Sequence, residues 1–245
     1  MKIVKPYHLD GSKKEQVAKM FNSISKRYDF LNRFLSLGID INWRNKTVQF
    51  IKTTGAKSIL DVATGTADLA ISLRNKIPDS KITGIDISSG MLEVGQQKIT
   101  RRKLDSNISL ILGDGEALPF PDHSYDAVTV AFGVRNFENL ENGLLEIQRV
   151  LKPGGSVGVL EFSKPEKFPF KQIYFFYFKY ILPTVGRIVS KDPSAYSYLP
   201  ASVEEFPYGQ NFITKLSDSG FINIKAEPLT FGVASLYTAH TSKLN

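Results

Sequence analysis

Apolar residues gather in five short runs, separated by segments in which apolar and polar residues alternate at helical spacing. The runs fall near residues 58–63, 81–87, 108–113, 125–132 and 156–162 and predict buried strands. The helical spacing appears near 67–76, 89–102 and 140–151. Strictly alternating strands and helices are typical of a parallel, doubly wound α/β sheet.

The C-terminal part of the chain predicts a different connection. Pro153-Gly154-Gly155 is expected to stop the helix near 140–151 and to turn the chain into the fifth strand. A helix is predicted around 204–219, ending at Gly220. Two closely spaced strand-like segments follow, Phe221–Pro228 and Val233–Thr241, and predict an antiparallel hairpin at the sheet edge. The whole sheet would then have seven strands.

Acidic residues mark three of the predicted strands. Asp61 lies in the first strand near its end, Asp86 near the end of the second, and Asp114 directly after the third. Open α/β folds bind ligands at the carboxyl edge of the sheet, where a carboxylate can accept both hydroxyls of a ribose. These three acids therefore predict a pocket for a ligand that contains a ribose.

The turn after the first strand indicates which ligand fits. A dinucleotide site needs GxGxxG so that the backbone approaches a pyrophosphate, but the matching positions here are Ala63, Gly65 and Asp68. A carboxylate at Asp68, close to Asp61, repels a pyrophosphate and suits a ligand with ammonium and sulfonium groups. S-adenosylmethionine meets that description. The alternative is an ordinary turn in which Asp68 only stabilises the helix N-terminus.

Four segments carry a resemblance to a known family, and they read DVATGTADLA, GIDIS, GDGEALPFPDHSYDAVTVAFGVRN and RVLKPGG. They resemble the seven-stranded, Rossmann-like (class I) S-adenosylmethionine-dependent methyltransferases, and within them the C-methyltransferases of menaquinone and ubiquinone biosynthesis. Two further segments are specific to that family, VAKMFNSISKRYDFLNRFLSLGIDINWR and FGVRNFENLENGL. The likeness runs from about Val17 nearly to the C-terminus. One departure is that Gly65 alone remains of the fold's glycine-rich E/DxGxGxG motif, where this family tolerates small residues.

The cofactor residues follow from the strand ends. The predicted cofactor-binding residues are Asp61, Gly65, Thr66, Asp86, Asp114, Gly115 and Ala131. Thr66 and the backbone amides of its turn are expected at the methionine carboxylate, and Asp86 at the ribose. Asp114 and Gly115 are expected at the adenine. Met91 either covers the adenine or fills the core.

The end of the fourth strand supplies the catalytic candidates, Arg135 and Asn136. Methylation of a ring carbon in a hydroquinone requires a phenol to lose its proton, and a guanidinium at Arg135 stabilises the phenolate. Asn136 would orient the same oxygen, and the resemblance also implies that this pair faces the substrate. The alternative for Arg135 is a salt-bridging surface residue. Arginine is a poor proton acceptor, and His123 is a weaker candidate for the base.

Tyr28 and Asp29 lie in the family-specific RYDFLN segment and are expected to line the substrate cavity together with Tyr177. The segment Val17–Trp43 has the apolar spacing of amphipathic helices and is expected to fold over the cofactor site. As a cover it would exclude water from the reacting sulfonium.

Residues 168–180 hold an aromatic side chain at most positions, which predicts a helix buried on more than one face. One interpretation is core packing against the sheet. The other is a lid with an inner face for an isoprenoid tail and an outer face for a bilayer. The basic residues near this lid are Lys167, Lys171, Lys179, Arg187 and Lys191.

We predict one domain over residues 1–245. Its parts are an N-terminal helical extension (1–56), a cofactor-binding core (57–163), a substrate or lid insertion (164–203) and a C-terminal helix and hairpin (204–245). A length of 245 residues with 42% hydrophobic content suits one such domain.

Composition narrows the partners and the location. The chain has no cysteine, and its three histidines are widely separated, so we expect no disulfide and no metal site. We find no apolar run long enough to span a membrane and no signal pattern, which predicts a cytoplasmic protein. The net charge of +7 is concentrated in residues 1–57, which hold twelve lysines and arginines against four acidic residues. This excess either forms a solvated helix face or attracts anionic lipid, at about 1 kcal/mol per basic residue.

The resemblance implies methyl transfer from S-adenosylmethionine to a ring carbon of a polyprenylated hydroquinone, with demethylmenaquinol as the first candidate. The alternatives are the benzoquinol step of ubiquinone synthesis, an NAD(P)-dependent oxidoreductase and a lipid-binding regulator without activity. We expect peripheral attachment to a membrane surface and no nucleic-acid partner, because no RNA- or DNA-binding motif is present. Exposed aromatic surface also favours a homodimer.

Overall fold

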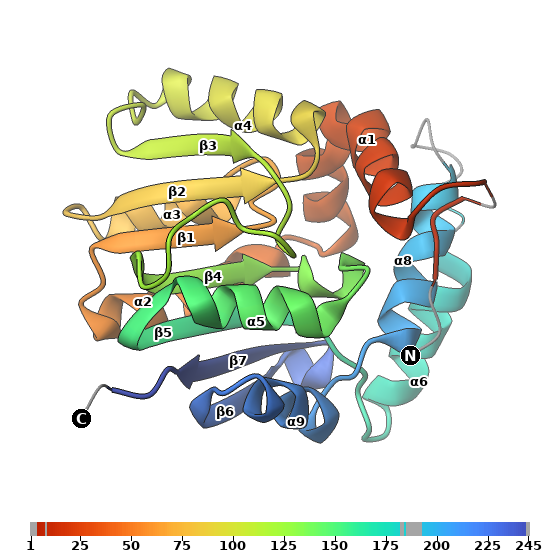
Figure 1. Cartoon of the computed structure of the whole chain (residues 1–245). Helices are drawn as coiled ribbons and strands as arrows, with labels where there is room; N and C mark the ends of the chain where they lie inside the picture. The colour runs from red at the N-terminus through yellow and green to blue at the C-terminus, as the bar shows by residue number, and fades with distance from the viewer. Residues whose placement is uncertain (1–3, 8, 182–183, 185–192, 244–245) are drawn as a thin grey trace.

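The computed structural model describes residues 4–7, 9–181, 184 and 193–243 (Figure 1). Its centre is a seven-stranded sheet with the order β3-β2-β1-β4-β5-β7-β6. The strands are β1 (Ser58–Val62), β2 (Lys81–Asp86), β3 (Ile108–Leu112), β4 (Tyr125–Ala131), β5 (Leu151–Phe162), β6 (Ile222–Leu229) and β7 (Ala234–His240). The first five strands run parallel, whereas β7 is antiparallel to β5 and β6. The predicted doubly wound sheet and its C-terminal hairpin are confirmed.

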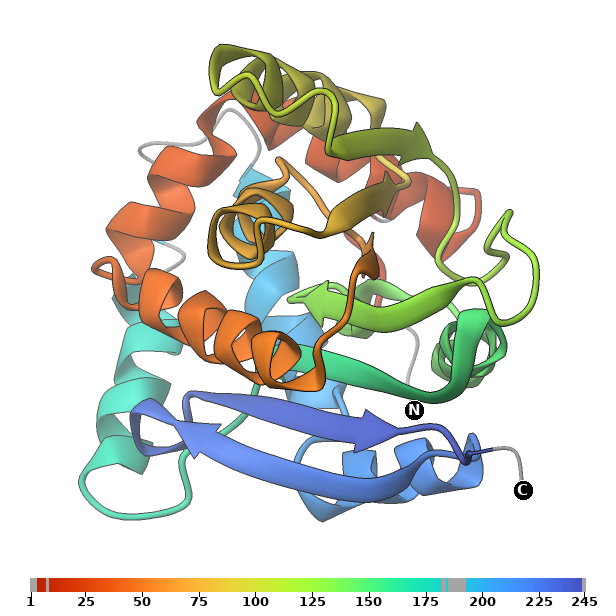
Figure 2. The ribbon, with the colours of Figure 1, turned by 90° about the vertical axis from the view of Figure 1, so that its left-hand side faces the viewer.

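Helices cover both faces of this sheet. They are α1 (Lys13–Leu35), α2 (Ile39–Thr54), α3 (Asp68–Lys76), α4 (Ser89–Arg101), α5 (Leu140–Val150), α6 (Phe170–Phe176), α8 (Pro193–Glu205) and α9 (Gln210–Asp218), with short turns η1 (Val134–Asn136), η2 (Tyr177–Ile181) and η3 (Thr230–Gly232). Successive side chains of a strand point to opposite faces. Ile59 therefore packs with α2, α3 and α4, while Leu60 packs with α5 and α9. Figure 2 shows the sheet between these helical layers.

β5 begins earlier than the strand predicted over 156–162. Leu151 already pairs with Tyr125, and the register then shifts so that Ser156 lies opposite Ala127. Pro153 and Gly154, the latter with φ of +75°, lie in the bulge that this shift creates. Proline cannot donate to a strand ladder, and bulges accommodate such residues. The Pro-Gly-Gly segment is thus a bulge inside the strand and not a turn that precedes it.

The single helix predicted around 204–219 is wrong, because the chain forms two helices there. α8 ends at Glu205 and α9 begins at Gln210. Between them, Pro207 has no backbone N–H, and Gly209 adopts a φ of +63°. The break lets α8 lie beyond the carboxyl end of the sheet while α9 packs on its face (Figure 1).

The N-terminal helices confirm the predicted amphipathic spacing. α1 begins at a capping box in which Ser12 and Glu15 each accept a hydrogen bond from the other's backbone. Val17 and Met20 lie on its buried face. α1 packs against α4 beyond the ends of the parallel strands, while most of α2 lies on the sheet against β5 (Figure 1). α1 and the start of α2 therefore cover the predicted ligand edge.

The aromatic insertion is buried on one face only, which corrects the prediction of burial on several faces. Tyr174 is buried, and Phe170, Tyr177 and Phe178 are partly covered by the N-terminal helices and the hairpin. The outward-facing aromatic residues are Phe168, Phe175, Phe176 and Tyr180. A short helix at the end of the sheet has a core on one side only, so its other side meets solvent.

Candidate active site

Three adjoining cavities lie where β1, β2 and β4 end. The turn pocket has a volume of about 50 Å³ and is lined among others by Asp29, Asp61, Thr64, Gly65, Thr66, Asp68 and Ala131. The edge pocket has a volume of about 70 Å³ and is lined among others by Gly65, Asp86, Met91, Asp114, Gly115, Ala131 and Asn136. The apolar cavity has a volume of about 360 Å³ and lies between α1, α6, α8 and η3. Tyr28 and Phe132 line all three, so they separate the polar pockets from the apolar cavity.

The β1–α3 turn reaches its shape through unusual backbone angles. Ala63, Gly65 and Ala67 have φ values of +54°, +57° and +63°. L-residues rarely adopt this left-handed region, and such strain is typical of functional sites. The end of β4 lies close by, because a Cβ added to Gly133 would come within 2.5 Å of the Ala63 Cβ. Small residues here allow both strand ends to approach one ligand.

Asp61 and Asp86 are buried carboxylates that accept hydrogen bonds from neutral groups. Asp61 accepts hydrogen bonds from the hydroxyls of Thr64 and Thr129, each at 2.6 Å. Asp86 accepts from the backbone N–H groups of Gly65 and Ser88, each at 2.8 Å. Within the part of the chain that the structure describes, neither carboxylate has an ion-pair partner. Burial is the main cause that raises the pKa of each to about 6, so a cationic ligand would be favoured beside them.

Asp29 was expected to line the substrate cavity. The structure instead places it in the turn pocket, and it does not line the apolar cavity. Its carboxylate accepts from the Thr66 hydroxyl at 2.5 Å and from Lys98 Nζ at 2.8 Å. Lys98 also pairs with Asp68 at the start of α3, and the charge of Lys98 is one reason why the pKa of Asp68 is lowered. Arg44 of α2 lies 3.6 Å from Asp68. This network fixes α1 and α2 over the turn.

The far end of the edge pocket joins α1 to the loop after β3. Lys14 pairs with Asp114, whose other oxygen accepts from the backbone N–H of Glu116 at 2.9 Å. Met91 is fully buried and lines this pocket. The Oδ1 atom of Asn136 is also buried there, and it has no hydrogen-bond partner among the described residues. The sequence contains no local signal for Lys14, because Asp114 is far away along the chain.

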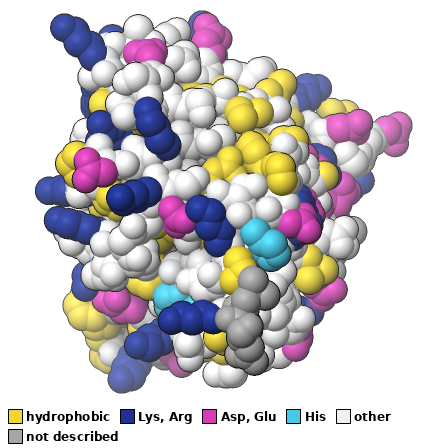
Figure 3. Space-filling view, turned by 60° about the vertical axis from the view of Figure 1, so that its left-hand side comes forward, with side chains coloured by type: hydrophobic (Ala, Val, Ile, Leu, Met, Phe, Trp, Pro, Cys, Tyr) yellow, Lys and Arg dark blue, Asp and Glu magenta, His cyan; other side chains and the backbone are white. Residues whose placement is uncertain are grey.

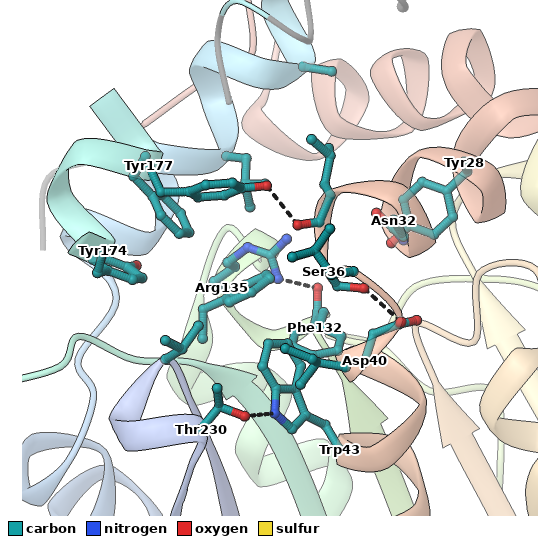
Figure 4. Close-up of a pocket in the computed structure, with 18 of the residues that line it drawn as sticks. Tyr28, Asn32, Ser36, Asp40, Trp43, Phe132, Arg135, Tyr174, Tyr177 and Thr230 are labelled. Carbon is teal, nitrogen blue, oxygen red and sulfur yellow. Dashed lines mark hydrogen bonds between the residues drawn. The ribbon is translucent and has the colours of Figure 1, made fainter. Parts of the chain in front are cut away.

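The apolar cavity has a different lining. Its walls include Met20, Ile24, Leu35, Trp43, Phe162, Phe170, Ile173, Tyr174, Tyr177, Phe178, Tyr198 and Val233. Three charged residues reach it, Asp40, Arg44 and Arg135. Asp40 and Arg44 pair with each other, and Asp40 also accepts from Ser36 at 2.7 Å. Figure 4 shows Arg135 near the centre of this cavity, between Tyr177, Tyr174 and Phe132.

Arg135 is held from behind by Glu161, which sequence reasoning missed. Glu161 is completely buried in β5 and accepts from Arg135 Nη1 at 2.8 Å. Nη1 also donates to the Phe132 carbonyl at 2.5 Å, and the guanidinium lies 5.3 Å from the centroid of the Phe162 ring. Burial raises the pKa of Glu161, while Arg135 favours its charged form. The signal was a single acid in the apolar run GVLEF, since a buried charge needs a partner.

Lys13 fixes the backbone of the same segment. Its ammonium donates to the carbonyls of Arg135, at 3.0 Å, and Phe137, at 2.6 Å. The side chain is almost fully buried, and this burial is the main cause that lowers its pKa to about 8. The first turn of α1 thus anchors η1, which carries the catalytic candidates.

Arg135 and Asn136 are adjacent in sequence but point into different spaces. Arg135 lines the apolar cavity, whereas Asn136 lines the edge pocket and donates to the Phe132 carbonyl at 3.3 Å. The expectation that both contact one substrate oxygen does not agree with this geometry. Phe132 has a φ of +58°, and its strained turn separates the two side chains.

Of the remaining predicted residues, Tyr28 and Tyr177 line the cavities and His123 does not. Tyr28 lies at the junction of the three spaces, and Tyr177 lines the apolar cavity and donates to the Leu35 carbonyl at 2.6 Å. His123 precedes β4, at the opposite end of that strand from Ala131, and its Nδ1 lies 2.9 Å from the Leu151 carbonyl. His123 is therefore excluded as the base. Trp43 forms part of the cavity wall and donates to Thr230 at 2.8 Å.

Comparisons with known proteins agree with this arrangement. The ubiE/COQ5 methyltransferase family matches residues 9–241. A demethylmenaquinone methyltransferase of Bacteroides fragilis is 46% identical over 236 residues, which is 96% of each chain. A ubiquinone/menaquinone biosynthesis C-methyltransferase UbiE of Geotalea daltonii is 47% identical over 227 residues, covering 92% of this chain and 96% of its own.

Solved structures show the same fold at low identity. The [4+2]-cyclase SpnF superposes with a TM-score of 0.69 at 17% identity, covering 94% of this chain and 97% of its own. A Haemonchus contortus phosphoethanolamine N-methyltransferase, solved with S-adenosylhomocysteine, superposes with a TM-score of 0.60 at 14% identity, covering 81% of this chain and 53% of its own. By its sequence match, the chain belongs to the ubiE/COQ5 methyltransferase family.

Proposed function

We propose that this enzyme transfers a methyl group from S-adenosylmethionine to a ring carbon of demethylmenaquinol. The observation that carries the proposal is the junction at Tyr28 and Phe132, where two small polar pockets meet one large apolar cavity. A polar methyl donor and an apolar acceptor can therefore meet at one place. The relative from Bacteroides fragilis is a demethylmenaquinone methyltransferase, which supports the same acceptor.

The polar pockets fit S-adenosylmethionine, which supplies an electrophilic methyl group on a positively charged sulfur when it is bound. Asp61 and Asp86 are buried and form no ion pair among the described residues, and Asn136 Oδ1, which has no partner within the same part of the chain, offers a further acceptor. We assign Asp86 to the ribose, and Asp114 and Gly115 to the adenine. Asp61, Gly65, Thr66 and Ala131 complete the predicted cofactor set and lie around the β1–α3 turn.

The chain's own residues prepare the acceptor in the apolar cavity. Arg135 lines this cavity, and its Nε has no hydrogen-bond partner among the described residues. A guanidinium stabilises a phenolate through charge-assisted hydrogen bonds. Loss of the phenol proton raises the electron density at the ring carbon that accepts the methyl group. Tyr28 lies between the acceptor and the donor pockets and aligns the two. We assign Asp29 to positioning of the turn, because it contacts Thr66 and Lys98.

Exposed apolar residues lie on or next to the elements that bound the apolar cavity, and we call them the rim. The rim residues are Phe30, Phe34, Leu37, Phe168, Ile173, Phe176, Tyr180 and Phe231. Leu37 is 84% exposed, yet it also lines the cavity. We assign the inner wall to the isoprenoid tail and the rim to the surface of the inner leaflet of the cell membrane, because exposed large apolar side chains beside a cavity suit a membrane surface.

Basic residues accompany this rim. Lys167, Lys171 and Lys179 are exposed on or next to the insertion, whereas Arg187 and Lys191 lie outside the described residues. Figure 3 shows another face of the molecule, toward the starts of the strands, on which basic, acidic and hydrophobic side chains are intermixed. None of the described helices combines the length and apolar character needed to cross a bilayer. We propose that the rim and the basic residues attach the enzyme to the membrane surface.

The acceptor test uses S-adenosylmethionine with a labelled methyl group and a panel of chemically reduced quinols. We expect label on a ring carbon of demethylmenaquinol, and none on the oxidised quinone, because the oxidised ring has no phenol to deprotonate. The benzoquinol precursor of ubiquinone belongs in the panel, since the relative from Geotalea daltonii is named for both pathways. Label on a hydroxyl oxygen would contradict the proposed reaction.

The membrane test measures co-sedimentation with vesicles of anionic phospholipid. Replacing Phe34 and Phe176 with serine removes two exposed apolar side chains, each worth about 1.5–3 kcal/mol if fully buried. We expect at least tenfold weaker vesicle binding. Leu145→Ser is the matched control, because Leu145 is 50% exposed on α5, away from the rim. If the variant instead changes a monomer–dimer equilibrium and leaves vesicle binding intact, the rim is the homodimer surface.

A further inference from the structure

Three side chains that line the apolar cavity each carry a buried polar atom without a hydrogen-bond partner among the described residues. These atoms are Nε of Arg135 and the hydroxyl oxygens of Tyr174 and Tyr198. The side chains come from three separate elements, η1, α6 and α8, and only 8%, 7% and 4% of their respective surfaces are exposed. A buried polar group without a partner is destabilising by about 1–3 kcal/mol. Three such groups on side chains that line one cavity suit a ligand that satisfies them when the side chains turn toward it.

The hydroxyls of the other two tyrosines in the cavity lining, Tyr28 and Tyr177, have hydrogen-bond partners in the protein. Tyr177 donates to the Leu35 carbonyl at 2.6 Å, and the Tyr28 hydroxyl is hydrogen-bonded to Asn32. Their hydroxyls are satisfied by the protein, although both side chains are less buried than Tyr174 and Tyr198. The two unpartnered hydroxyls therefore differ from ordinary core tyrosines in this same cavity.

The unpartnered groups are hydrogen-bond donors. Nε of an arginine can only donate. Burial raises the pKa of Tyr174 and of Tyr198 far above the ordinary value, so both phenols keep their protons at neutral pH. Three donors without acceptors suit a ligand that presents acceptor oxygens, and they do not suit a plain hydrocarbon.

The surrounding surfaces suit a flat ring. Tyr174 stacks on Phe178 with ring centroids 4.2 Å apart, and Phe178 meets Phe162 edge-to-face at 6.3 Å. Phe162 in turn lies under the Arg135 guanidinium. Figure 4 shows Tyr174 on the insertion side of the cavity, with Arg135 near the centre. Aromatic walls with donors among them favour a planar ligand that carries oxygen atoms.

We propose that Tyr174 and Tyr198 bind the ring oxygens of the acceptor, together with Nε of Arg135. This inference rests on the proposed function, since it takes the hydroquinone ring as the occupant. It assigns to the insertion a role beyond covering the tail. The helices α6 and α8 orient the ring, so that one edge faces Tyr28 and the donor pockets.

The test measures binding without turnover. Trp43 is the only tryptophan of the chain and lines the cavity, so its fluorescence reports occupancy. Two probes share one ring system and one tail, 2-prenyl-1,4-naphthoquinone and 2-prenylnaphthalene, and differ only in the two oxygens. We expect Tyr174→Phe and Tyr198→Phe each to weaken quinone binding about 3- to 10-fold, the range for one hydrogen bond, and to leave naphthalene binding unchanged.

The control is Tyr180→Phe, which removes a hydroxyl from a tyrosine that is 53% exposed and does not line the cavity. We expect no change in either dissociation constant. Thermal unfolding without ligand gives an independent readout. Removal of an unpartnered buried hydroxyl should leave the melting temperature unchanged or raise it, whereas a structural hydroxyl would lower it.

Failure of this inference can be separated from failure of the proposed function. If the wild-type protein binds the quinone and methylates quinols, but both phenylalanine variants bind the quinone equally well, water satisfies the hydroxyls and the inference is wrong. Equal affinity of the wild type for the quinone and the naphthalene would also show that the inference is wrong. If the wild type neither binds the quinone nor methylates any quinol, the proposed function itself is wrong.

Discussion

The polar pockets and the apolar cavity lie side by side but are built in different ways. The polar pockets are made by strand ends and short turns of the sheet, and many of their side chains are fixed by protein partners, such as Asp29 by Thr66 and Lys98. The apolar cavity is made by helices that project beyond the sheet, and it contains donors without partners, as at Tyr174 and Tyr198.

This difference separates two tasks. A turn held in a strained conformation by the sheet gives a rigid site for the small, polar donor. A large cavity between helices accommodates a flat ring and a long tail, because apolar contacts make few demands on direction. Orientation of the ring must then come from a small number of hydrogen bonds, and Arg135 is the main donor among them. Substitutions should therefore affect donor binding and acceptor chemistry separately.

The largest expected effect is that of Arg135→Ala. Loss of an electrostatic group at the developing oxyanion typically lowers turnover by about 10²–10³-fold, whereas binding of S-adenosylhomocysteine in the polar pockets should change less than about threefold. Turnover and calorimetric binding measure the two effects. Turnover close to that of the wild type would remove Arg135 from the mechanism.

This variant also leaves Glu161 buried without its partner, at a cost of about 3–5 kcal/mol in unfolding free energy. The double variant Arg135→Ala/Glu161→Gln is therefore the control. We expect it to recover much of the stability in denaturant unfolding and none of the turnover. Recovery of turnover together with stability would mean that Arg135 acts only through the fold.

Asp86→Asn is expected to weaken donor binding and to leave acceptor binding unchanged, the opposite of Arg135→Ala. A hydrogen bond to a charged acceptor contributes about 1.5–3 kcal/mol, so S-adenosylhomocysteine should bind about 10- to 100-fold more weakly. Fluorescence titration of Trp43 with the naphthoquinone probe should show no change, because Asp86 does not line the apolar cavity. A loss of quinone binding of similar size would show that the two spaces are not independent.

The pH dependence of donor binding is the next largest effect. Burial raises the pKa of Asp86 to about 6, so the carboxylate takes up its proton and loses acceptor capacity as the pH falls through 6. The affinity for S-adenosylhomocysteine should be constant above about pH 7 and fall by up to about tenfold per pH unit below 6. The dependence should be shallower in Asp86→Asn, with the contribution of Asp61 remaining. A flat profile in the wild type would contradict the assignment.

The smallest expected effect is that of Tyr177→Phe, which contrasts with Tyr174→Phe. The Tyr177 hydroxyl joins the insertion to the Leu35 carbonyl at the end of α1, and its removal should lower the unfolding free energy by about 1 kcal/mol. For a chain of this size the melting temperature should fall by about 2–4 °C, and the Michaelis constant for the quinol should rise slightly. A melting temperature equal to that of Tyr174→Phe would remove the distinction between paired and unpaired hydroxyls.

Local features were predictable from the sequence. The strands β1 to β4, the helices between them and the C-terminal hairpin follow from periodicity and turn residues, which are short-range properties. Asp61, Asp86 and Asp114 were expected at one sheet edge because parallel strands end together. Even here, a local signal was misread at Pro207 and Gly209, where one helix was expected and two exist.

Partners that are distant along the chain were not predictable. Glu161 behind Arg135, Lys14 on Asp114 and Lys98 on Asp29 depend on how whole elements pack against each other. The separation of Arg135 from Asn136 depends on the strained backbone at Phe132. Residue type indicates that a buried acid such as Glu161 needs a partner, but neither periodicity nor residue type identifies which residue that partner is.

The sequence by itself determined the class of sheet, the acidic ligand edge and the family, because short segments carry the alternation of strands and helices, the turn residues and the family motifs. The tertiary structure alone decided which side chains remain unpaired in the apolar cavity. A hydroxyl such as that of Tyr198 gains or loses a partner only when α1, α6 and α8 come together, and that outcome depends on the packing of three helices at once.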